Sequence, residues 1–374
     1  MFQQRSYSER LTFMQKARSM DVLMLFCILF IGIISCFAMY STDGGEFNYH
    51  TKSHITRLII FFSMFLILSF VRPKTWHTIS YVFYFIVLAM LIWASFFGIT
   101  ASGSQRWISL YFINLQPSEL MKIAIIVCFA KFYHRVQVGN VNNFKNLIIP
   151  LIILLMPIFL VINQPDLGTA ILIAASGFAV IWLAGVNLKY FIYSFLIFLV
   201  SAPFVISFLK PYQKLRILTF FNPERDPLGA GYQIIQSKIA VGSGGLSGKG
   251  FLRGTQSYLD FLPEKHTDFI FTLYSEEYGF LGSLLLLFLY SILIYRIIKI
   301  GSISRSFFPK LFCYGFGTAI FIYIVINMSM VLGMLPIVGS PLPIMSYGGS
   351  SMMATMIGLS IVMGCKIYHR QLIA

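Results

Sequence analysis

Ten long apolar runs follow one another along the 374-residue chain, separated by short polar stretches. A helix needs about 20 mostly apolar residues to cross a bilayer, and these runs have about that length. The pattern therefore predicts an all-α polytopic membrane protein with about ten transmembrane helices. The expected spans are 20–41, 54–71, 76–98, 119–135, 147–163, 167–185, 190–209, 268–296, 310–334 and 350–367.

Lysine and arginine are unevenly distributed between the two sides of this arrangement. With the N-terminus inside, the inner segments hold sixteen of them, whereas the short outer loops hold only Lys52 and Arg106. Because cytoplasmic loops carry the excess of basic residues, we expect both termini to be cytoplasmic. The long segment 210–267, between spans seven and eight, then becomes a large extracytoplasmic loop.

Composition narrows the class of protein further. Only 11% of the residues are charged, against about 25% in soluble domains, so an ordinary soluble protein is excluded and a single membrane domain, 1–374, is expected. The net charge of +15 fits the positive-inside bias and predicts no nucleic-acid partner. The five cysteines lie in apolar runs without CxxC or Cys/His spacing, so we expect neither a disulfide framework nor a metal centre. The first apolar run exceeds a signal peptide's and lacks a cleavage site, so it is expected to be retained.

The large loop carries two patterned segments. GYQIIQSKIAVG (231–242) places Tyr232, Ile235 and Ile239 on one face and polar residues such as Gln233 and Ser237 elsewhere, which predicts a short amphipathic helix. GSGGLSGKG (242–250) resembles a phosphate loop but lacks its required residues at 243 and 250. Two interpretations stay open: a flexible hinge, or a nest of N–H groups that meets a pyrophosphate together with Lys249. The loop's eight cations are likewise either solvated charges or part of a site for an anionic ligand.

Carboxylates gather at the outer ends of the predicted spans. Glu119 and Lys122 share a helix face and could form a structural ion pair. Asp166 stands where a carboxylate caps a helix. Asp268 is flanked by His266 and two phenylalanines, an apolar setting that raises a carboxyl pKa toward that of a general base. His266 alone is a weak candidate for a metal ligand, since no other histidine has suitable spacing.

Two further features complete the picture from the residues. Glu276 and Glu277 lie deeper in span eight and are expected to pair with a neighbouring helix or a partner. The segment LPIVGSPLPIMSYGGSS (335–351) has three prolines and three glycines, so it cannot form a regular helix. Irregular backbone at membrane depth is tolerated where it lines a cavity. We therefore expect either a cavity wall, with Ser346 among its hydroxyls, or a plain re-entrant turn.

Several of these segments together resemble the SEDS family (shape, elongation, division and sporulation), and its RodA branch more than its FtsW branch. The matching segments are GSQRWI (103–108), QPSELMKIA (116–124), QPDLGT (164–169), DPLGAGYQIIQSKIAVGSGGLSGKG (226–250), GTQSYLDFLPEKHTDFIF (254–271), SEEYGFLG (275–282) and PIVGSPLPIMSYGGSS (336–351). They extend over most of the chain, and the match in the large loop is highly specific.

The resemblance implies a peptidoglycan glycosyltransferase of the bacterial plasma membrane that polymerises lipid II and acts in cell elongation. It implies work with a class B penicillin-binding protein and other elongation-complex proteins, and it places the catalytic carboxylate on Asp268. The candidates for binding the substrate are Arg106, Glu119, Lys122, Gln233, Ser237, Lys249, Arg253 and Ser346. A divalent cation, Mg²⁺ or Mn²⁺, could assist, although no ligand set in the sequence requires one.

Two alternatives belong to other functional classes. Spans interrupted by glycine and proline also suit a lipid II flippase, but transport gives no reason for a carboxylate beside an external cationic loop. A scaffold that only positions the penicillin-binding protein would tolerate Asp268→Asn.

Overall fold

The computed structural model describes residues 12–101, 104–109, 114–208, 211–226, 229–255 and 264–373. Each of the ten expected spans corresponds to a helix. These are α2 (Val22–Thr42), α3 (Tyr49–Ser69), α4 (Pro73–Phe97), α5 (Pro117–Arg135), α6 (Phe144–Asn163), α7 (Leu167–Leu183), α8 (Leu188–Phe208), α12 (Ile270–Ile303), α13 (Phe307–Val331) and α14 (Gly349–Ile367). Among the described residues, seven of them (all but α5, α7 and α8) are long and apolar enough to cross a membrane.

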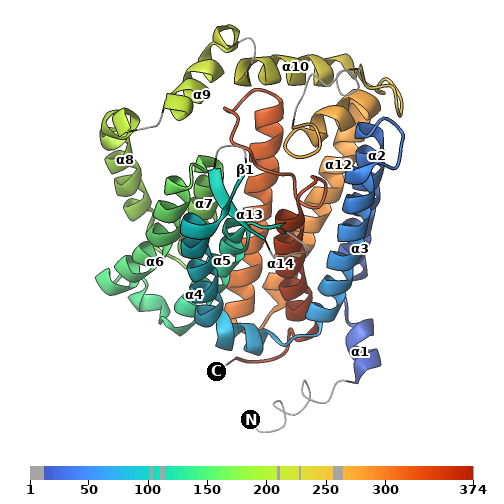
Figure 1. Cartoon of the computed structure of the whole chain (residues 1–374). Coiled ribbons are helices and arrows are strands. Elements are labelled where there is room, and N and C mark those ends of the chain that lie inside the picture. Colours follow the sequence, from blue (N-terminus) through green and yellow to red (C-terminus); the bar gives the residue numbers. More distant parts are fainter. Residues whose placement is uncertain are drawn as a thin grey trace.

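The helices form a bundle with α5, α13 and α14 inside it (Figure 1). Every residue of α5 from Pro117 to Lys131 is buried, whereas α3 and α6 expose many apolar side chains on the outside of the bundle. Exposed apolar faces of this extent suit a lipid environment and would be a liability in water. The polar residues of α5 therefore lie in the protein interior, away from the face that lipid would contact.

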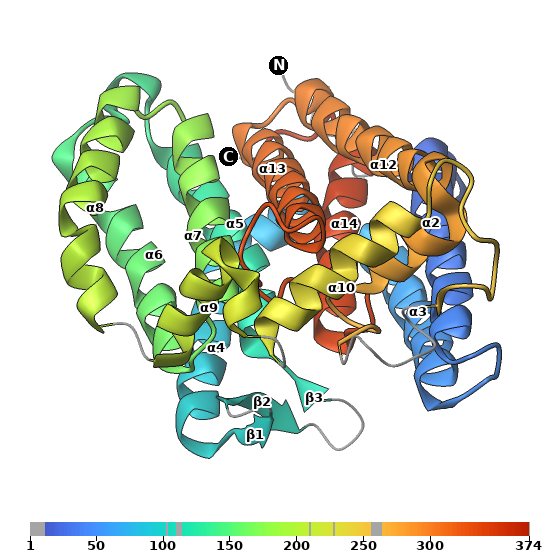
Figure 2. The same ribbon diagram turned by 90° about the horizontal axis from the view of Figure 1, so that it is seen from above.

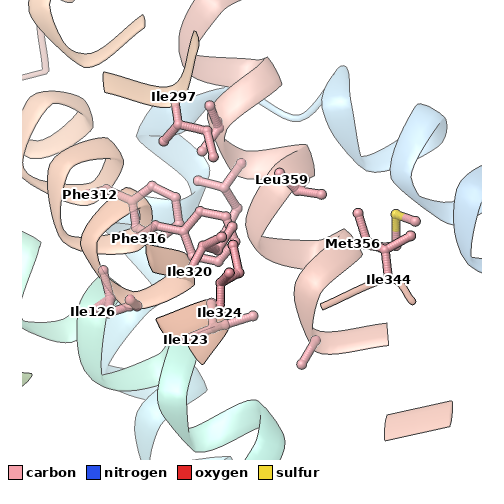
Figure 3. Close-up of a cluster of buried hydrophobic side chains, with 14 of the residues drawn as sticks. Ile123, Ile126, Ile297, Phe312, Phe316, Ile320, Ile324, Ile344, Met356 and Leu359 are labelled. Atoms are coloured by element: carbon pink, nitrogen blue, oxygen red, sulfur yellow. The ribbon is translucent and has the colours of Figure 1, made fainter. Parts of the chain in front are cut away.

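The interior is packed by aromatic rings against small and branched side chains. Phe312 and Phe316 of α13 stack with ring centroids 5.7 Å apart, beside residues of α5, α12 and α14 (Figure 3). A Cβ on Gly358 of α14 would come within 2.2 Å of the Phe316 ring. Small residues at such crossings let membrane helices approach closely.

The end of the bundle opposite the two chain termini carries the shorter elements. Helices α9 (Pro211–Phe221) and α10 (Ala230–Ser243) lie across this end (Figures 1 and 2). α10 confirms the helix predicted at 231–242, but its buried face carries Ile234 and Ser237, whereas Ile239 of the predicted apolar face is exposed. α9 was not predicted. Short 3-10 turns occupy Val138–Asn140 and Pro223–Arg225, and a six-residue helix, α1 (Phe13–Arg18), lies near the other end. Residues 256–263 of the expected loop lie outside the described part of the chain.

A small sheet departs from the all-α expectation. Strand β1 (Ile99–Ala101) pairs antiparallel with β2 (Ser104–Ser109), which pairs antiparallel with β3 (Asn114–Leu115). The sheet leads from the end of α4 to the start of α5 (Figure 2). It positions Arg106 and Asn114 next to the first turn of α5, where Pro117 and Glu119 stand in positions that favour a helix start.

Candidate active site

A cavity of about 1170 Å³ opens where the sheet, the start of α5 and the segment between α13 and α14 meet. Its walls come from parts of the chain far apart in sequence. They include Arg57, Arg106, Gln116, Glu119, Asp166, Arg216, Gln233, Glu264, Thr267, Asp268, Val338, Gly339, Pro341 and Tyr347. Because residues 337–351 contribute so many of these side chains, the prediction of a cavity wall in that segment is confirmed.

Asp268 lies in the turn that precedes α12, two residues before its first helical residue. Asn327 of α13 fixes this turn: its Nδ2 donates to the backbone oxygen of Asp268 (3.0 Å) and to that of Ser340 (2.7 Å). A second link joins the same turn to the cavity wall, because the Tyr347 amide donates to the His266 oxygen at 2.9 Å. The turn and the proline-rich segment are therefore held as one unit.

The Asp268 carboxylate faces the cavity rather than a bonding partner. No hydrogen bond to this carboxylate comes from the residues that the structure describes. Burial raises its pKa to about 7, the negative charge of Glu264 adds to the rise, and Arg106 opposes it. The residue is partly exposed, on the wall of the cavity. A carboxylate with a pKa near neutrality is suited to take up a proton from a hydroxyl.

Three arginines give the cavity its positive charge. Arg106 Nη1 donates to Asp166 Oδ2 at 3.0 Å, and its buried Nε has no hydrogen-bond partner among the described residues. The Arg57 guanidinium lies 4.6 Å from the centre of the Tyr347 ring. Arg216 of α9 reaches the Ile337 oxygen at 3.3 Å. Guanidinium groups match phosphate oxygens well, so the three form a surface that can meet a pyrophosphate.

Two of the other cavity carboxylates, Asp166 and Glu119, are paired with cations of the chain. Asp166 caps α7 by accepting from the Thr169 amide (3.1 Å), as expected, and also accepts from Gln116 (3.0 Å) and Arg106. Glu119 accepts from Lys122 at 2.8 Å. This contact is the buried ion pair predicted from the sequence. Glu264 accepts from the Thr267 hydroxyl at 2.9 Å, so Asp268 is the wall carboxylate that receives no hydrogen bond from the described residues.

Of the nine predicted site residues, the structure brings four to the cavity: Arg106, Glu119, Gln233 and Asp268. Lys122 lies behind Glu119, with its ammonium 4.6 Å from the Tyr323 ring centre. Ser237 donates to the Val331 oxygen at 2.6 Å, and Ser346 accepts from the Leu342 amide at 2.7 Å. Both serines are buried in structural hydrogen bonds. Lys249 and the exposed Arg253 lie outside the cavity wall.

The glycine-rich segment 242–250 is neither the flexible hinge nor the pyrophosphate nest considered from the sequence. α12 is broken at Gly279, whose φ of 65° is non-helical, and the break frees backbone groups. The segment satisfies them: Lys249 and Gly250 donate to the Glu276 and Glu277 oxygens (both 3.0 Å), and Phe280 donates to the Gly245 oxygen (2.9 Å). These amides are therefore occupied, which contradicts a pyrophosphate nest, and the segment is packed, which contradicts a hinge. A Cβ on Gly248 would meet the Glu277 oxygen at 2.0 Å.

Lys249 reinforces this packing with its side chain. Its ammonium donates to Glu276 Oε1 at 2.6 Å and to Thr255 Oγ1 at 2.9 Å. Glu277 accepts from Ser41 of α2 and from the Leu252 amide. Both glutamates are buried. Glu277 contacts a neighbouring helix, as expected, although its Oε2 has no hydrogen-bond partner among the described residues. Glu276 pairs with the loop residue Lys249 instead of with a helix.

Three functional candidates were missed from the sequence. Arg57 lies inside the expected span 54–71, and Arg216 is one of the eight cations of the large loop. Asn327 gave a usable signal, since an amide in a strongly apolar helix needs a partner. One group of described residues could hold a metal ion, namely Asp43, His50 and His266. It brings a second histidine to His266 through the fold rather than through sequence spacing.

Known proteins resemble this chain over nearly its whole length. It is 38% identical over 362 residues to the peptidoglycan glycosyltransferase MrdB of Escherichia coli K12, covering 96% of this chain and 97% of the relative. A solved structure of a peptidoglycan synthase complex that coordinates polymerization and crosslinking superposes with a TM-score of 0.80 at 28% identity, covering 94% of this chain and 99% of that one. A crystal structure of a mutant of the Thermus thermophilus rod shape determining protein RodA has the same fold, with a TM-score of 0.71 at 23% identity, covering 94% and 99% of the two chains.

Residues 16–371 match the cell cycle protein family of FtsW, RodA and SpoVE. The match extends over far more than half of the chain, and the long apolar helices agree with it. This chain is a multi-pass membrane protein that belongs to the FtsW/RodA/SpoVE family.

Proposed function

We propose that this chain is a peptidoglycan glycosyltransferase that polymerises lipid II at the outer face of the bacterial plasma membrane during cell elongation. The observation that carries the proposal is a cavity lined by three arginines and by Asp268, whose carboxylate receives no hydrogen bond from the described residues. The identity to MrdB, a peptidoglycan glycosyltransferase, supports the same activity. We place all ten helices across the membrane, both termini in the cytoplasm, and the segment 210–267 outside.

The reaction assigns a task to each part of the cavity. The C4 hydroxyl oxygen of an acceptor sugar bonds to C1 of the donor, and the bond from C1 to the pyrophosphate oxygen breaks. The hydroxyl proton moves to Asp268, while undecaprenyl pyrophosphate leaves with the bonding electron pair. A positioned general base contributes a factor of about 10²–10⁴ to such a rate.

The arginines act where negative charge develops on the leaving group. Arg106, Arg57 and Arg216 come from three different elements, so they can surround a pyrophosphate from several sides. Preorganised donors of this kind are worth most in a site shielded from water. Glu119 and Gln233 also face the cavity and are proposed to contact sugar hydroxyls. A divalent cation, Mg²⁺ or Mn²⁺, could neutralise pyrophosphate charge together with these arginines.

Partner and membrane fit the same reaction. The chain is proposed to work with a class B penicillin-binding protein, which cross-links the strands, and with other elongation-complex proteins. The similarity to the chain in a complex that couples polymerization to crosslinking supports this partnership. Because the donor and the leaving group carry lipid tails, the cavity must communicate with the membrane lipids around the bundle.

The test is a polymerisation assay on the purified complex with its transpeptidase site blocked and labelled lipid II supplied. Wild type should give a ladder of glycan strands on a gel, and Asp268→Asn should abolish it while still binding the partner. Glu46→Gln is the matched control, because Glu46 is an exposed carboxylate outside the cavity. A well-folded wild-type complex that gives no ladder would point to transport or scaffolding, and an undiminished ladder from Asp268→Asn would move the base to another carboxylate.

A further inference from the structure

Three side chains from distant parts of the sequence converge just behind the Asp268 turn. Asp43 follows the last residue of α2, His50 stands in the first turn of α3, and His266 lies two residues before Asp268. One ligand atom from each residue lies within 4.8 Å of the others. None of the three lines the cavity, so the cluster is distinct from the catalytic wall.

Two of the three distances within the cluster are close to those that a tetrahedral metal ion requires. Asp43 Oδ1 is 3.1 Å from His266 Nε2 and 3.5 Å from His50 Nδ1. Ligands about 2.0–2.1 Å from a tetrahedral zinc ion stand about 3.3–3.4 Å from each other. The ligand atoms of His50 and His266 lie within 4.8 Å of each other, so an ion could enter between the three atoms after an adjustment of the His50 ring.

The ligand atoms are also held in place by neighbours. Asp43 Oδ2 accepts from the Thr51 amide (2.9 Å) and the Thr51 hydroxyl (2.6 Å), which turns Oδ1 toward both imidazoles. The His50 ring stacks on the His266 ring at 4.2 Å between centroids and packs edge-on against Tyr347. Hydrogen bonds such as those from Thr51 to Asp43 orient the ligands at natural metal sites.

We propose that Asp43, His50 and His266 bind a divalent transition-metal ion of the zinc class. Two imidazoles and one carboxylate favour zinc, cobalt, nickel or copper over magnesium or manganese, which prefer oxygen ligands. Three protein ligands leave a fourth position for water. The His50 side chain is 43% exposed, while Asp43 is 4% exposed, so the ion has a route from solvent to a buried carboxylate.

The position of the site gives the ion a structural task. It would join the turn between α2 and α3 to the turn that carries Asp268, which already bonds to Tyr347 through the His266 oxygen. The bound ion therefore links these two turns and fixes the backbone next to the proposed general base. This task is separate from any Mg²⁺ or Mn²⁺ that accompanies the pyrophosphate.

The experiment measures metal binding by the purified full-length chain in detergent, after removal of any histidine tag and treatment with a chelator. Zn²⁺ is titrated by calorimetry, and Co²⁺ is used as a visible-absorption probe of four-coordinate geometry. Wild type should bind one equivalent and show intense tetrahedral Co²⁺ bands. Loss of a residue that only orients a ligand weakens metal binding by about 10–100-fold. Loss of a ligand itself should cost more, so His50→Gln and Asp43→Asn should weaken metal binding by more than about 100-fold.

Two further variants separate a built site from other outcomes. Thr51→Val keeps all three ligands and should cause a smaller loss of affinity, whereas His369→Gln, in a histidine far from the cluster, should bind as wild type does. Thermal unfolding without metal shows whether His50→Gln folds, and Zn²⁺ should raise the melting temperature of wild type but not of this variant. Equal binding by wild type and His50→Gln, or no stoichiometric binding by wild type, would overturn the proposal and leave a hydrogen-bonded triad.

Discussion

Two segments of the region between α10 and α12 carry equally conspicuous motifs but are treated differently by the fold. In the glycine-rich segment 242–250, the three amides from Gly248 to Gly250 all donate to backbone oxygens, and the Lys249 ammonium is paired with Glu276. In the turn 264–269, the Thr267 and Phe269 amides also donate to a backbone oxygen, yet the Asp268 carboxylate receives no hydrogen bond from the described residues. The polar groups of the first segment bond to other parts of the protein, whereas the second segment leaves the Asp268 carboxylate available to a ligand.

Whether a side chain is bonded within the protein, more than the prominence of its motif, therefore separates a functional residue from a structural one. Buried polar groups in proteins are almost always bonded. The Asp268 carboxylate, which is partly open to the cavity, receives no hydrogen bond from the described residues, and burial raises its pKa to about 7, so it calls for a functional reason. The paired Lys249 and Glu276 need no such reason.

Arg106→Gln should have the largest effect on turnover among the cavity arginines. Loss of one preorganised donor to a developing negative charge costs a factor of about 10²–10³ in rate. The measurement is the rate of glycan-strand formation by the partner-bound enzyme. Arg253→Gln is the control, since Arg253 is exposed and outside the cavity. Similar losses in both variants would contradict the division between cavity and support.

Lys249→Met should lower stability instead of turnover. It leaves Glu276, which is only 1% exposed, without its ion-pair partner. Removing one member of a buried pair costs about 3–5 kcal/mol, and the partial exposure of Lys249 puts the expected loss near 3 kcal/mol. Thermal unfolding of the complex measures this, together with turnover per folded molecule. A stable Lys249→Met enzyme with strongly reduced turnover would return Lys249 to the list of pyrophosphate ligands.

Asn327→Leu should have the smallest effect of the three, and a mixed one. It removes the two hydrogen bonds that join the Asp268 turn to Ser340, each worth about 0.5–1.5 kcal/mol. Because Asn327 positions the base without lining the cavity, kcat should fall while KM changes little. A change confined to KM would show that Asn327 affects substrate binding instead.

The helices could be predicted from sequence because the bilayer imposes their length. All ten runs became helices, with boundaries within five residues for nine of them and seven for the end of α12 (296 expected, Ile303 observed). The sheet at 99–115 was missed, since its strands are short and follow a membrane run without clear alternation. α9 was missed as well, because its charged residues conceal the helical pattern.

The site was predictable only in part, for physical reasons. Asp268, Arg106, Glu119 and Gln233 were found because their motifs and their positions at span ends are visible in the sequence. Arg57 and Arg216 join them through helix packing, which no local pattern reveals. The Asp43–His266 contact joins residues 223 positions apart. Lys249 belongs to a motif whose amides bond to the backbone oxygens at the break of α12 near Gly279.

The most direct test of the central claim compares Asp268→Asn with Lys249→Met in one polymerisation assay, with rates divided by the amount of folded complex. If Asp268 is the general base, Asp268→Asn should melt like wild type and lose a factor of about 10²–10⁴ in rate. Lys249→Met should melt earlier and keep nearly full turnover per folded molecule. Retained polymerisation by a well-folded Asp268→Asn enzyme would contradict the assignment of Asp268 as the general base.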